Sequence, residues 1–236
     1  MQIVVKVFRS NPAEDSQPRF DSFCLDVDPN DRVLDALERA RDEADASLAY
    51  RRSCAHAVCG SCAMRIYGRN ALACKVLIKD VWKKEITLEP LLGLRVIRDL
   101  VVDMEPFFDH YYSVMPFLIN TEPLPEDKKE RLQTPQERER FDDTTKCILC
   151  GACTTACPSF WINEGYLGPA AIVGAHRFIY DSRDFGAGER LAILNEQNGI
   201  WRCRTAFNFT EACPRNIKIT RAIAEIKRTI QTKRLY

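Results

Sequence analysis

Eleven of the 236 residues are cysteines, and these side chains have the greatest capacity for chemistry in the chain. They are Cys24, Cys54, Cys59, Cys62, Cys74, Cys147, Cys150, Cys153, Cys157, Cys203 and Cys213. A disulfide framework fits them poorly, because their number is odd, many lie only a few residues apart, and no export signal is visible. Thiolates at such short spacings are typical ligands of metals and iron–sulfur clusters. The cysteines therefore predict metal binding.

The first cysteine group has the spacing of a plant-type [2Fe–2S] site. Cys54, Cys59 and Cys62 follow the pattern C-x4-C-x2-C, and Cys74 comes after eleven further residues. The Gly–Ser pair before the third cysteine is small enough to let backbone amides approach the cluster sulfurs and tune the reduction potential. A zinc site is the alternative, but zinc modules usually pair two short knuckles.

The second group follows the bacterial ferredoxin pattern C-x2-C-x2-C-x3-C-P, from Cys147 through Cys150 and Cys153 to Cys157. In two-cluster ferredoxins the fourth cysteine of this run serves the other cluster. A second run must then supply the missing ligand, and Cys213, which a proline follows, has the complementary ending. The sequence therefore predicts a [4Fe–4S] cluster on Cys147, Cys150, Cys153 and Cys213.

Cys157 then belongs to a third cluster, and the second run must provide its other ligands. The ferredoxin spacing, laid backward from Cys213, points to positions 203, 206 and 209, which hold Cys203, Ala206 and Phe209. If only the ligand at 206 were missing, cysteines at 157, 203 and 209 would remain, and three thiolates are the ligand set of a [3Fe–4S] cluster. Phenylalanine has no donor atom, so only Cys157 and Cys203 remain as candidate ligands, and the presence of this cluster stays open.

Residues 1–105 are predicted to form the domain that positions the first group, and their pattern is mixed α/β. Alternating apolar and polar residues predict strands over 3–8, 23–27, 63–67 and 85–88. A turn is expected at 68–70. A helix opening at 29–31 would place on one face Val33, Leu37, Ala40 and Ala44. Cys24 lies in a predicted strand and is expected to be a small buried hydrophobic residue. These elements suit a small curved sheet that grips one helix.

Residues 106–236 are predicted to form a second, helical domain, so the fold class is α+β. Its last segment repeats an apolar residue at helical spacing, through Ile219, Ile223, Ile226 and Ile230. The polar stretch 120–143, punctuated by Pro123, Pro125 and Pro135, is expected to be a solvated loop with some helix.

Composition narrows the possible partners. The 34 basic and 33 acidic side chains nearly cancel, so nothing points to a nucleic-acid partner. No uncharged apolar run approaches the roughly 20 residues of a membrane span. The first residues lack the charged and apolar regions of a signal peptide. We therefore expect a protein that stays inside the cell and has no membrane segment of its own.

These motifs together resemble the iron–sulfur subunit of succinate dehydrogenase and fumarate reductase, the succinate:quinone oxidoreductases. The similar segments are 51–54, 58–62, 96–104, 147–150, 157–161, 168–170 and 181–184, together with Cys203 and the pair Cys213–Pro214. The resemblance implies a β-grasp plant-type ferredoxin domain followed by an α-helical bacterial-ferredoxin-like domain. It also implies [2Fe–2S], [4Fe–4S] and [3Fe–4S] clusters that carry electrons one at a time from a flavin to a quinone.

One position departs from this family pattern. Phe209 stands where the family has the third [3Fe–4S] ligand, which leaves the chain one cluster cysteine short once Cys24 is set aside. Three explanations are open: an altered residue at this position, an absent or altered cluster, or a substitute ligand from elsewhere in the chain.

The resemblance also implies partners. No G-x-G-x-x-G fingerprint is present, so FAD and the dicarboxylate site are expected on a partner flavoprotein, and no residue here is expected to be catalytic. A membrane anchor with haem b and a quinone would complete the complex, with this chain held peripherally at the cytoplasmic face of the inner or plasma membrane. The physiological direction, succinate oxidation or fumarate reduction, is left open.

The family places the quinone near the third cluster. The matching positions are Pro158, Ser159, Ile162, Arg204 and Lys227. Ubiquinone-type members have Trp and His at the positions of Ile162 and Arg204, so the resemblance favours menaquinone. Alternatively, these two side chains only pack against the anchor.

Two other functions are compatible with the motifs. One is a ferredoxin-type electron adaptor for a different, soluble flavoprotein oxidoreductase that needs no quinone. The other is a zinc-stabilised interaction module without redox activity.

Overall fold

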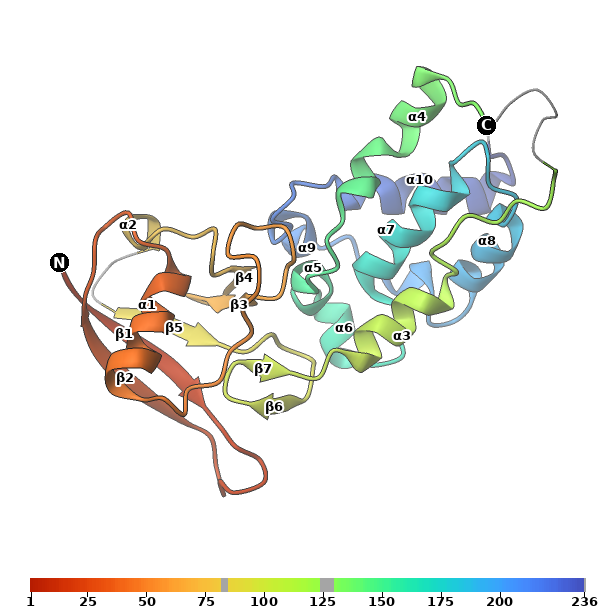
Figure 1. Ribbon diagram of the computed structural model, residues 1–236. Coiled ribbons are helices and arrows are strands. Elements are labelled where there is room, and N and C mark those ends of the chain that lie inside the picture. The colour runs from red at the N-terminus through yellow and green to blue at the C-terminus, as the bar shows by residue number, and fades with distance from the viewer. Residues whose placement is uncertain (82–84, 124–129, 236) are drawn as a thin grey trace. The chain divides into compact units, whose positions relative to one another are not determined.

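The computed structural model describes residues 1–81, 85–123 and 130–235, and it divides into two compact units (Figure 1). The first, here called the sheet unit, comprises Met1–Pro106, Ile148–Ala156 and Ala212–Pro214. The second, the helical unit, comprises Phe107–Cys147, Cys157–Glu211 and Arg215–Tyr236. Two short segments that follow far later in the sequence therefore belong to the sheet unit, and both carry cysteines.

The sheet unit is built on five strands in the order β2-β1-β5-β3-β4. They are β1 (Gln2–Arg9), β2 (Arg19–Asp26), β3 (Ala63–Ile66), β4 (Arg69–Leu72) and β5 (Glu85–Glu89). β1 runs antiparallel to β2 and parallel to β5, and β3 is antiparallel to both of its neighbours. The four predicted strands are present, but β2 starts four residues earlier and ends before Val27, and β3 ends before Tyr67. β4 was not predicted.

The turn between β3 and β4 lies earlier than the sequence pattern suggested. Tyr67 and Gly68 both have positive φ angles, 51° and 74°, as a two-residue hairpin turn requires. Arg69 and Asn70 already pair with β3. The turn was predicted at 68–70, but it consists of Tyr67 and Gly68. Arg69 and Asn70 are the first residues of β4.

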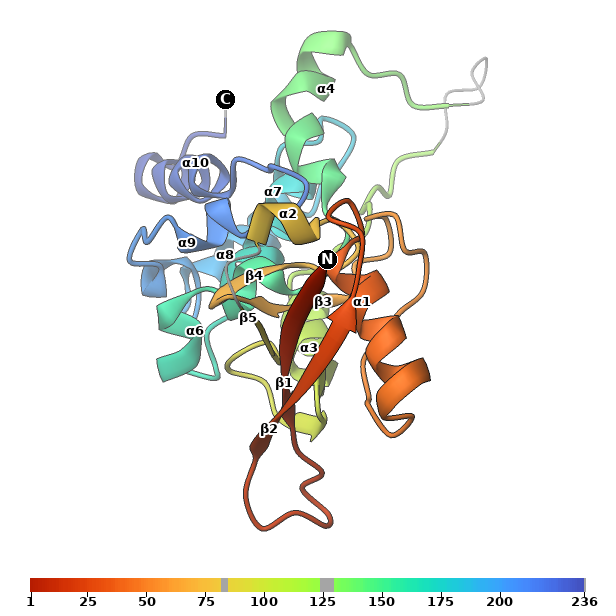
Figure 2. The ribbon, with the colours of Figure 1, turned by 90° about the vertical axis from the view of Figure 1, so that its left-hand side faces the viewer.

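Helix α1 (Val33–Arg39) covers one face of this sheet, as both views show (Figures 1 and 2). Val33, Leu37 and Ala40 are buried against the sheet, as predicted. Ala44 is exposed, which corrects the prediction that it shares their face. The physical reason is that Ala40–Ala44 form a π-helical turn, whose wider spacing moves the following residues out of helical phase.

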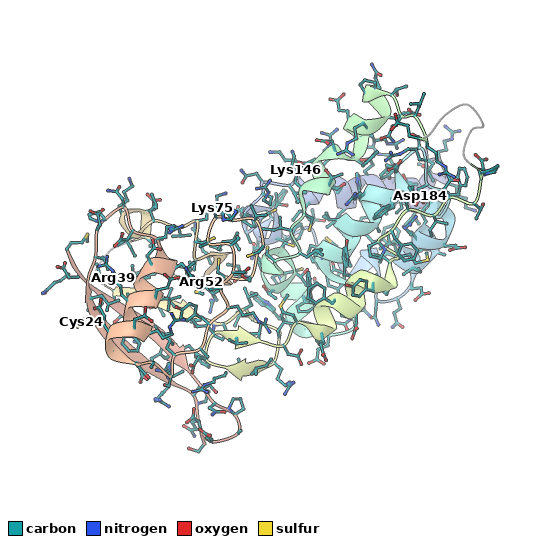
Figure 3. The ribbon with its side chains drawn as sticks, in the orientation of Figure 1. Cys24, Arg39, Arg52, Lys75, Lys146 and Asp184 are labelled. Carbon is teal, nitrogen blue, oxygen red and sulfur yellow. The ribbon has the colours of Figure 1, made fainter. Side chains whose placement is uncertain are left out.

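Alternation along β1 and β2 builds the core of the sheet unit. Phe23 and Leu25 on β2 are buried under α1 together with residues of β1. Successive side chains of a strand point to opposite faces, so Cys24 faces the other way. It is exposed, and Figure 3 labels it. The expectation that Cys24 is a buried hydrophobic residue was wrong for this reason.

Short elements complete the sheet unit: α2 (Ile78–Val81), the β6 (Val96–Arg98) and β7 (Val101–Val102) ribbon, and α5 (Ala152–Thr155). The helical unit contains α4 (Pro135–Asp142), α6 (Pro158–Ile162), α7 (Gly168–Ile179), α8 (Ala187–Asn195), α9 (Asn208–Glu211) and α10 (Ile219–Thr232). α3 (Glu105–Ser113) begins at the end of the sheet unit.

The predicted amphipathic helix at the C-terminal end is α10. Ile219, Ile223 and Ile226 are buried, and Ile230 is half-buried, so one apolar face packs into the unit. The predicted helix within 120–143 is α4, which starts at a capping box between Thr134 and Glu137. Pro125 of that stretch lies outside the described residues.

A fully buried ion pair in the helical unit links α8 to the segment that follows α3. Arg190 on α8 is 0% exposed, and its Nη1 lies 2.5 Å from Oδ1 of Asp184, which Figure 3 labels. The same guanidinium donates to the carbonyl oxygens of Met115 and Phe117, at 2.9 and 2.7 Å.

Among the described residues, we find no helix with the length and apolar character to cross a membrane.

Candidate iron–sulfur sites

The loop that carries Cys54, Cys59 and Cys62 connects the first helix to β3. It has left-handed backbone at Ala55, Ala57 and Gly60, with φ angles of 58°, 62° and 73°. Such conformations curl the chain tightly and turn successive N–H groups toward the inside of the loop. The result is a concave backbone with amide donors around the first cysteine.

Three backbone amides donate to the sulfur of Cys54. The N–H groups of His56, Val58 and Cys59 lie 3.4, 3.4 and 3.3 Å from its Sγ. These hydrogen bonds, that of Cys59 first, lower the pKa of Cys54 to about 6. The loop therefore stabilises a thiolate, the form in which cysteine binds iron.

The remaining thiols of the first group differ in their surroundings. The Ala57 N–H donates to Cys74 Sγ at 3.2 Å, and the Ser61 hydroxyl lies 3.1 Å from Cys59 Sγ. Cys62 is buried, and burial raises its pKa to about 12. A metal removes the proton from such a thiol when it binds, so burial excludes water without preventing coordination. The four thiols therefore fit a [2Fe–2S] cluster that is shielded from water on the side of the buried Cys62 and Cys74.

Three of the four cysteines of the second group lie in the sheet unit. Cys150 and Cys153 stand in the segment Ile148–Ala156, Cys213 stands in Ala212–Pro214, and Cys147 is the last residue of its segment in the helical unit. Gly151, with a φ of 76°, bends the chain between the two central cysteines. This bend leads directly into α5.

Two polar side chains of the sheet unit anchor these segments, and neither was predicted from the sequence. Asn70 on β4 is buried, and its Nδ2 donates to the Ala152 carbonyl at 3.0 Å and to Thr155 Oγ1 at 2.8 Å. Lys75, which Figure 3 labels, donates from Nζ to the Pro214 carbonyl at 2.7 Å. The available signals were a polar asparagine shortly before the apolar residues Ala71 and Leu72, and a lysine directly after Cys74.

The two cysteine loops touch each other at Gly60. A Cβ at this position would lie 2.6 Å from Cys150 Cβ and 3.2 Å from the Ile148 carbonyl oxygen. Only glycine fits such a close approach with a positive φ angle. The predicted [2Fe–2S] loop and the predicted [4Fe–4S] loop therefore lie in van der Waals contact.

Gly60→Ala is expected to destabilise the protein by about 2–5 kcal/mol. Left-handed backbone costs an alanine roughly 1–2 kcal/mol, and overpacking against Cys150 costs about 1–3 kcal/mol more. Gly68→Ala is the matched control, because its φ is +74° but its nearest contact is the end of the Arg65 side chain at 3.5 Å. Thermal unfolding of both variants measures the difference, and equal losses would contradict the close contact.

The third group lies in the helical unit, where both Cys157 and Cys203 are buried. Burial raises the pKa of Cys157, the amides of Phe160 and Ser159 lower it, and a negative charge on Cys203 raises it. The Thr205 N–H donates to Cys203 Sγ at 3.4 Å. Phe209 is fully buried and offers no donor atom to iron. These residues do not fit a three-thiolate [3Fe–4S] cluster.

The predicted quinone-side residues also lie in the helical unit. Pro158 and Ser159 start α6, and Ile162 at its end is 86% exposed. Arg204 is exposed beside Cys203. Lys227 on α10 donates from Nζ to the Cys203 carbonyl at 3.0 Å and stands 5.8 Å from the Trp201 ring centroid. Within the described residues, no three His, Cys, Asp or Glu side chains are grouped to hold a single metal ion.

Comparison with known proteins agrees with the motifs. Residues 4–109 match the family described as 2Fe-2S iron-sulfur cluster binding domain, and residues 140–214 match the 4Fe-4S dicluster domain. The chain is 42% identical over 223 residues to the succinate dehydrogenase iron-sulfur subunit of Paracoccus denitrificans, covering 94% of this chain and 85% of that protein. The chain belongs to the family of succinate dehydrogenase iron–sulfur subunits.

Further members of this family are similarly close. The Coxiella burnetii subunit is 42% identical, covering 94% of both chains. The mitochondrial "succinate dehydrogenase [ubiquinone] iron-sulfur subunit" of Candida glabrata is 40% identical, covering 95% of this chain and 90% of that one. The predicted family, the [2Fe–2S] and [4Fe–4S] cofactors and the role as the electron-transfer subunit of a succinate dehydrogenase are confirmed.

Solved structures share the fold. A chain of the Mycobacterium smegmatis Sdh1 complex in the apo form matches with a TM-score of 0.87 at 23% identity, covering 100% of this chain and 98% of that one. A hypothetical protein from Helicobacter pylori matches with a TM-score of 0.59 at 17% identity, covering 96% of this chain and 39% of that one. A mixed sheet followed by helices, with the [2Fe–2S] domain before the [4Fe–4S] domain, is thus confirmed as the fold.

Proposed function

We propose that this chain relays single electrons from the FAD of a succinate-oxidising flavoprotein to a quinone. The contact of the two cysteine loops at Gly60 and Cys150 carries this proposal. It supports a short route between the first two clusters. Bound iron–sulfur clusters supply one-electron carriers, which convert the two-electron chemistry of the flavin into single steps.

The proposed ligands are those of the spacing argument. Cys54, Cys59, Cys62 and Cys74 hold the [2Fe–2S] cluster, and Cys147, Cys150, Cys153 and Cys213 hold the [4Fe–4S] cluster. The amides that donate to Cys54 and Cys74 would stabilise the reduced [2Fe–2S] cluster, which is more negative than the oxidised one. They would therefore raise the reduction potential of this cluster.

We propose the finer fold assignment as well. Residues 1–105 would be a β-grasp plant-type ferredoxin domain, and residues 106–236 an α-helical bacterial-ferredoxin-like domain. The parallel pairing of β1 with β5 in the middle of the sheet and the cover of α1 on one face support the first assignment.

The quinone side is proposed at Pro158, Ser159, Ile162, Arg204 and Lys227. The exposure of Ile162 and Arg204 supports a surface that meets a membrane anchor, with haem b in the anchor. The absence of Trp and His at these two positions favours menaquinone. In this assembly the chain would lie at the cytoplasmic face of the inner or plasma membrane, held by the anchor.

The test is purification through a tag on this chain from gently solubilised membranes. The expected product is brown, contains flavin, and reduces a menaquinone analogue with succinate. A flavoprotein complex that lacks an anchor and leaves quinone unreduced would instead indicate a soluble electron adaptor. A colourless protein that contains zinc would contradict both redox functions, because zinc is d¹⁰.

A further inference from the structure

Phe209 occupies a fixed, interior position in the helical unit. It lies on α9, and its side chain is 0% exposed. The next residue fastens α9 to α10, because the Thr210 and Thr220 hydroxyl oxygens lie 2.7 Å apart and the Thr220 N–H donates to Thr210 Oγ1 at 3.2 Å. The backbone at 209 is therefore held in place, and its side chain is directed into the unit.

The other parts of a cluster site are retained around Cys157 and Cys203. Both thiols are buried, and each accepts hydrogen bonds from backbone amides, including that of Thr205 at 3.4 Å. Thr205 has a φ of 60°, a left-handed conformation that turns its N–H toward Cys203. Lys227 fixes the Cys203 carbonyl from α10. Such amide donors stabilise thiolates and cluster sulfurs.

No other thiol of the helical unit can replace the missing ligand. Apart from Cys157 and Cys203, that unit contains Cys147, which the ferredoxin spacing assigns to the [4Fe–4S] cluster. Cys24 is exposed on β2 and stands outside every cysteine motif. A [3Fe–4S] cluster normally takes one thiolate for each of its three irons, so two thiols leave one iron without a cysteine ligand.

We propose that the third site of this chain holds no [3Fe–4S] cluster, and that Phe209 alone prevents its assembly. The site is then a two-thiol remnant whose backbone still has the form of a cluster site. A single cysteine at position 209 completes it. This inference rests on the proposed function for the first two clusters, which stay unaffected by position 209.

The test compares the wild-type complex with Phe209→Cys and Phe209→Ala. Low-temperature EPR of the oxidised complexes is the first readout, because an oxidised [3Fe–4S] cluster has a half-integer spin whereas oxidised [2Fe–2S] and [4Fe–4S] clusters are diamagnetic. Iron per chain is the second. We expect about six irons and no signal in the wild type and in Phe209→Ala, and about nine irons with a near-isotropic signal in Phe209→Cys.

Two results would overturn the inference. A stoichiometric oxidised signal in the wild type means that another ligand completes the cluster. About six irons in a folded Phe209→Cys complex means that more than this residue prevents assembly. EPR of the dithionite-reduced wild type distinguishes a failure of this inference from a failure of the proposed function. If the proposed function is wrong, the signals of the reduced [2Fe–2S] and [4Fe–4S] clusters are missing as well.

Discussion

Replacing Cys150 by alanine abolishes succinate-driven quinone reduction, with an expected loss of at least about 100-fold. Outer-shell changes at metal sites already cost roughly 10–100-fold, and this substitution removes a proposed ligand of the [4Fe–4S] cluster itself. Electrons that leave the flavin then have no route onward through this chain. Reduction of an artificial dye at the flavin should persist in part, because the dye does not need that route.

Cys24→Ala is the matched control for this prediction. Cys24 is exposed on β2 and stands outside every cysteine motif, so its loss should leave quinone reduction and iron content unchanged. The measurement is the ratio of quinone to dye reduction in purified complexes of the wild type and both variants. If the ratio of quinone to dye reduction were unchanged in Cys150→Ala, Cys150 would not be a cluster ligand.

Arg190→Met has the largest expected effect on stability, a loss of about 3–5 kcal/mol. Removing one partner of a buried ion pair leaves the other charge uncompensated. Here Asp184 would be left buried, and the carbonyl oxygens of Met115 and Phe117 would lose their donor. The segment that these bonds hold against α8 should open first.

Arg138→Met provides the comparison, because Arg138 forms a surface ion pair with Asp142 one turn away on α4, and both side chains are about half exposed. Pairs of this kind contribute about 0.3–0.5 kcal/mol. Pulse proteolysis of this subunit in the purified complex, across a urea series, measures both losses. If Arg190→Met shifted the urea midpoint no more than Arg138→Met, the buried pair would not be a major source of stability.

The features that the sequence predicted best are those that depend on short spacing. The cysteine motifs and the strands β1 and β2 are local patterns, so their periods are visible without knowledge of the fold. The error at Ala44 had a local cause as well, but a π-helical turn has no clear sequence signature. β4 was missed because it has only four residues, with a polar Arg–Asn pair at its start.

The anchoring contacts could not be predicted because they join residues that lie far apart in the sequence. Asn70 holds a segment 82 and 85 residues later in the chain, and Lys75 holds one 139 residues away. Nothing near either residue specifies its partner. The same applies to Gly60, whose need for glycine arises from the approach of Cys150 and not from its own loop alone.

The most direct test of the central claim is rapid freeze-quench EPR of the purified complex after mixing with succinate. The signal of the reduced [2Fe–2S] cluster should appear at an intensity near one spin per chain, and excess quinone should remove it again within the turnover time. Quinone reduction at the full rate, with the [2Fe–2S] cluster oxidised throughout in the absence of any such transient, would contradict electron relay through this chain.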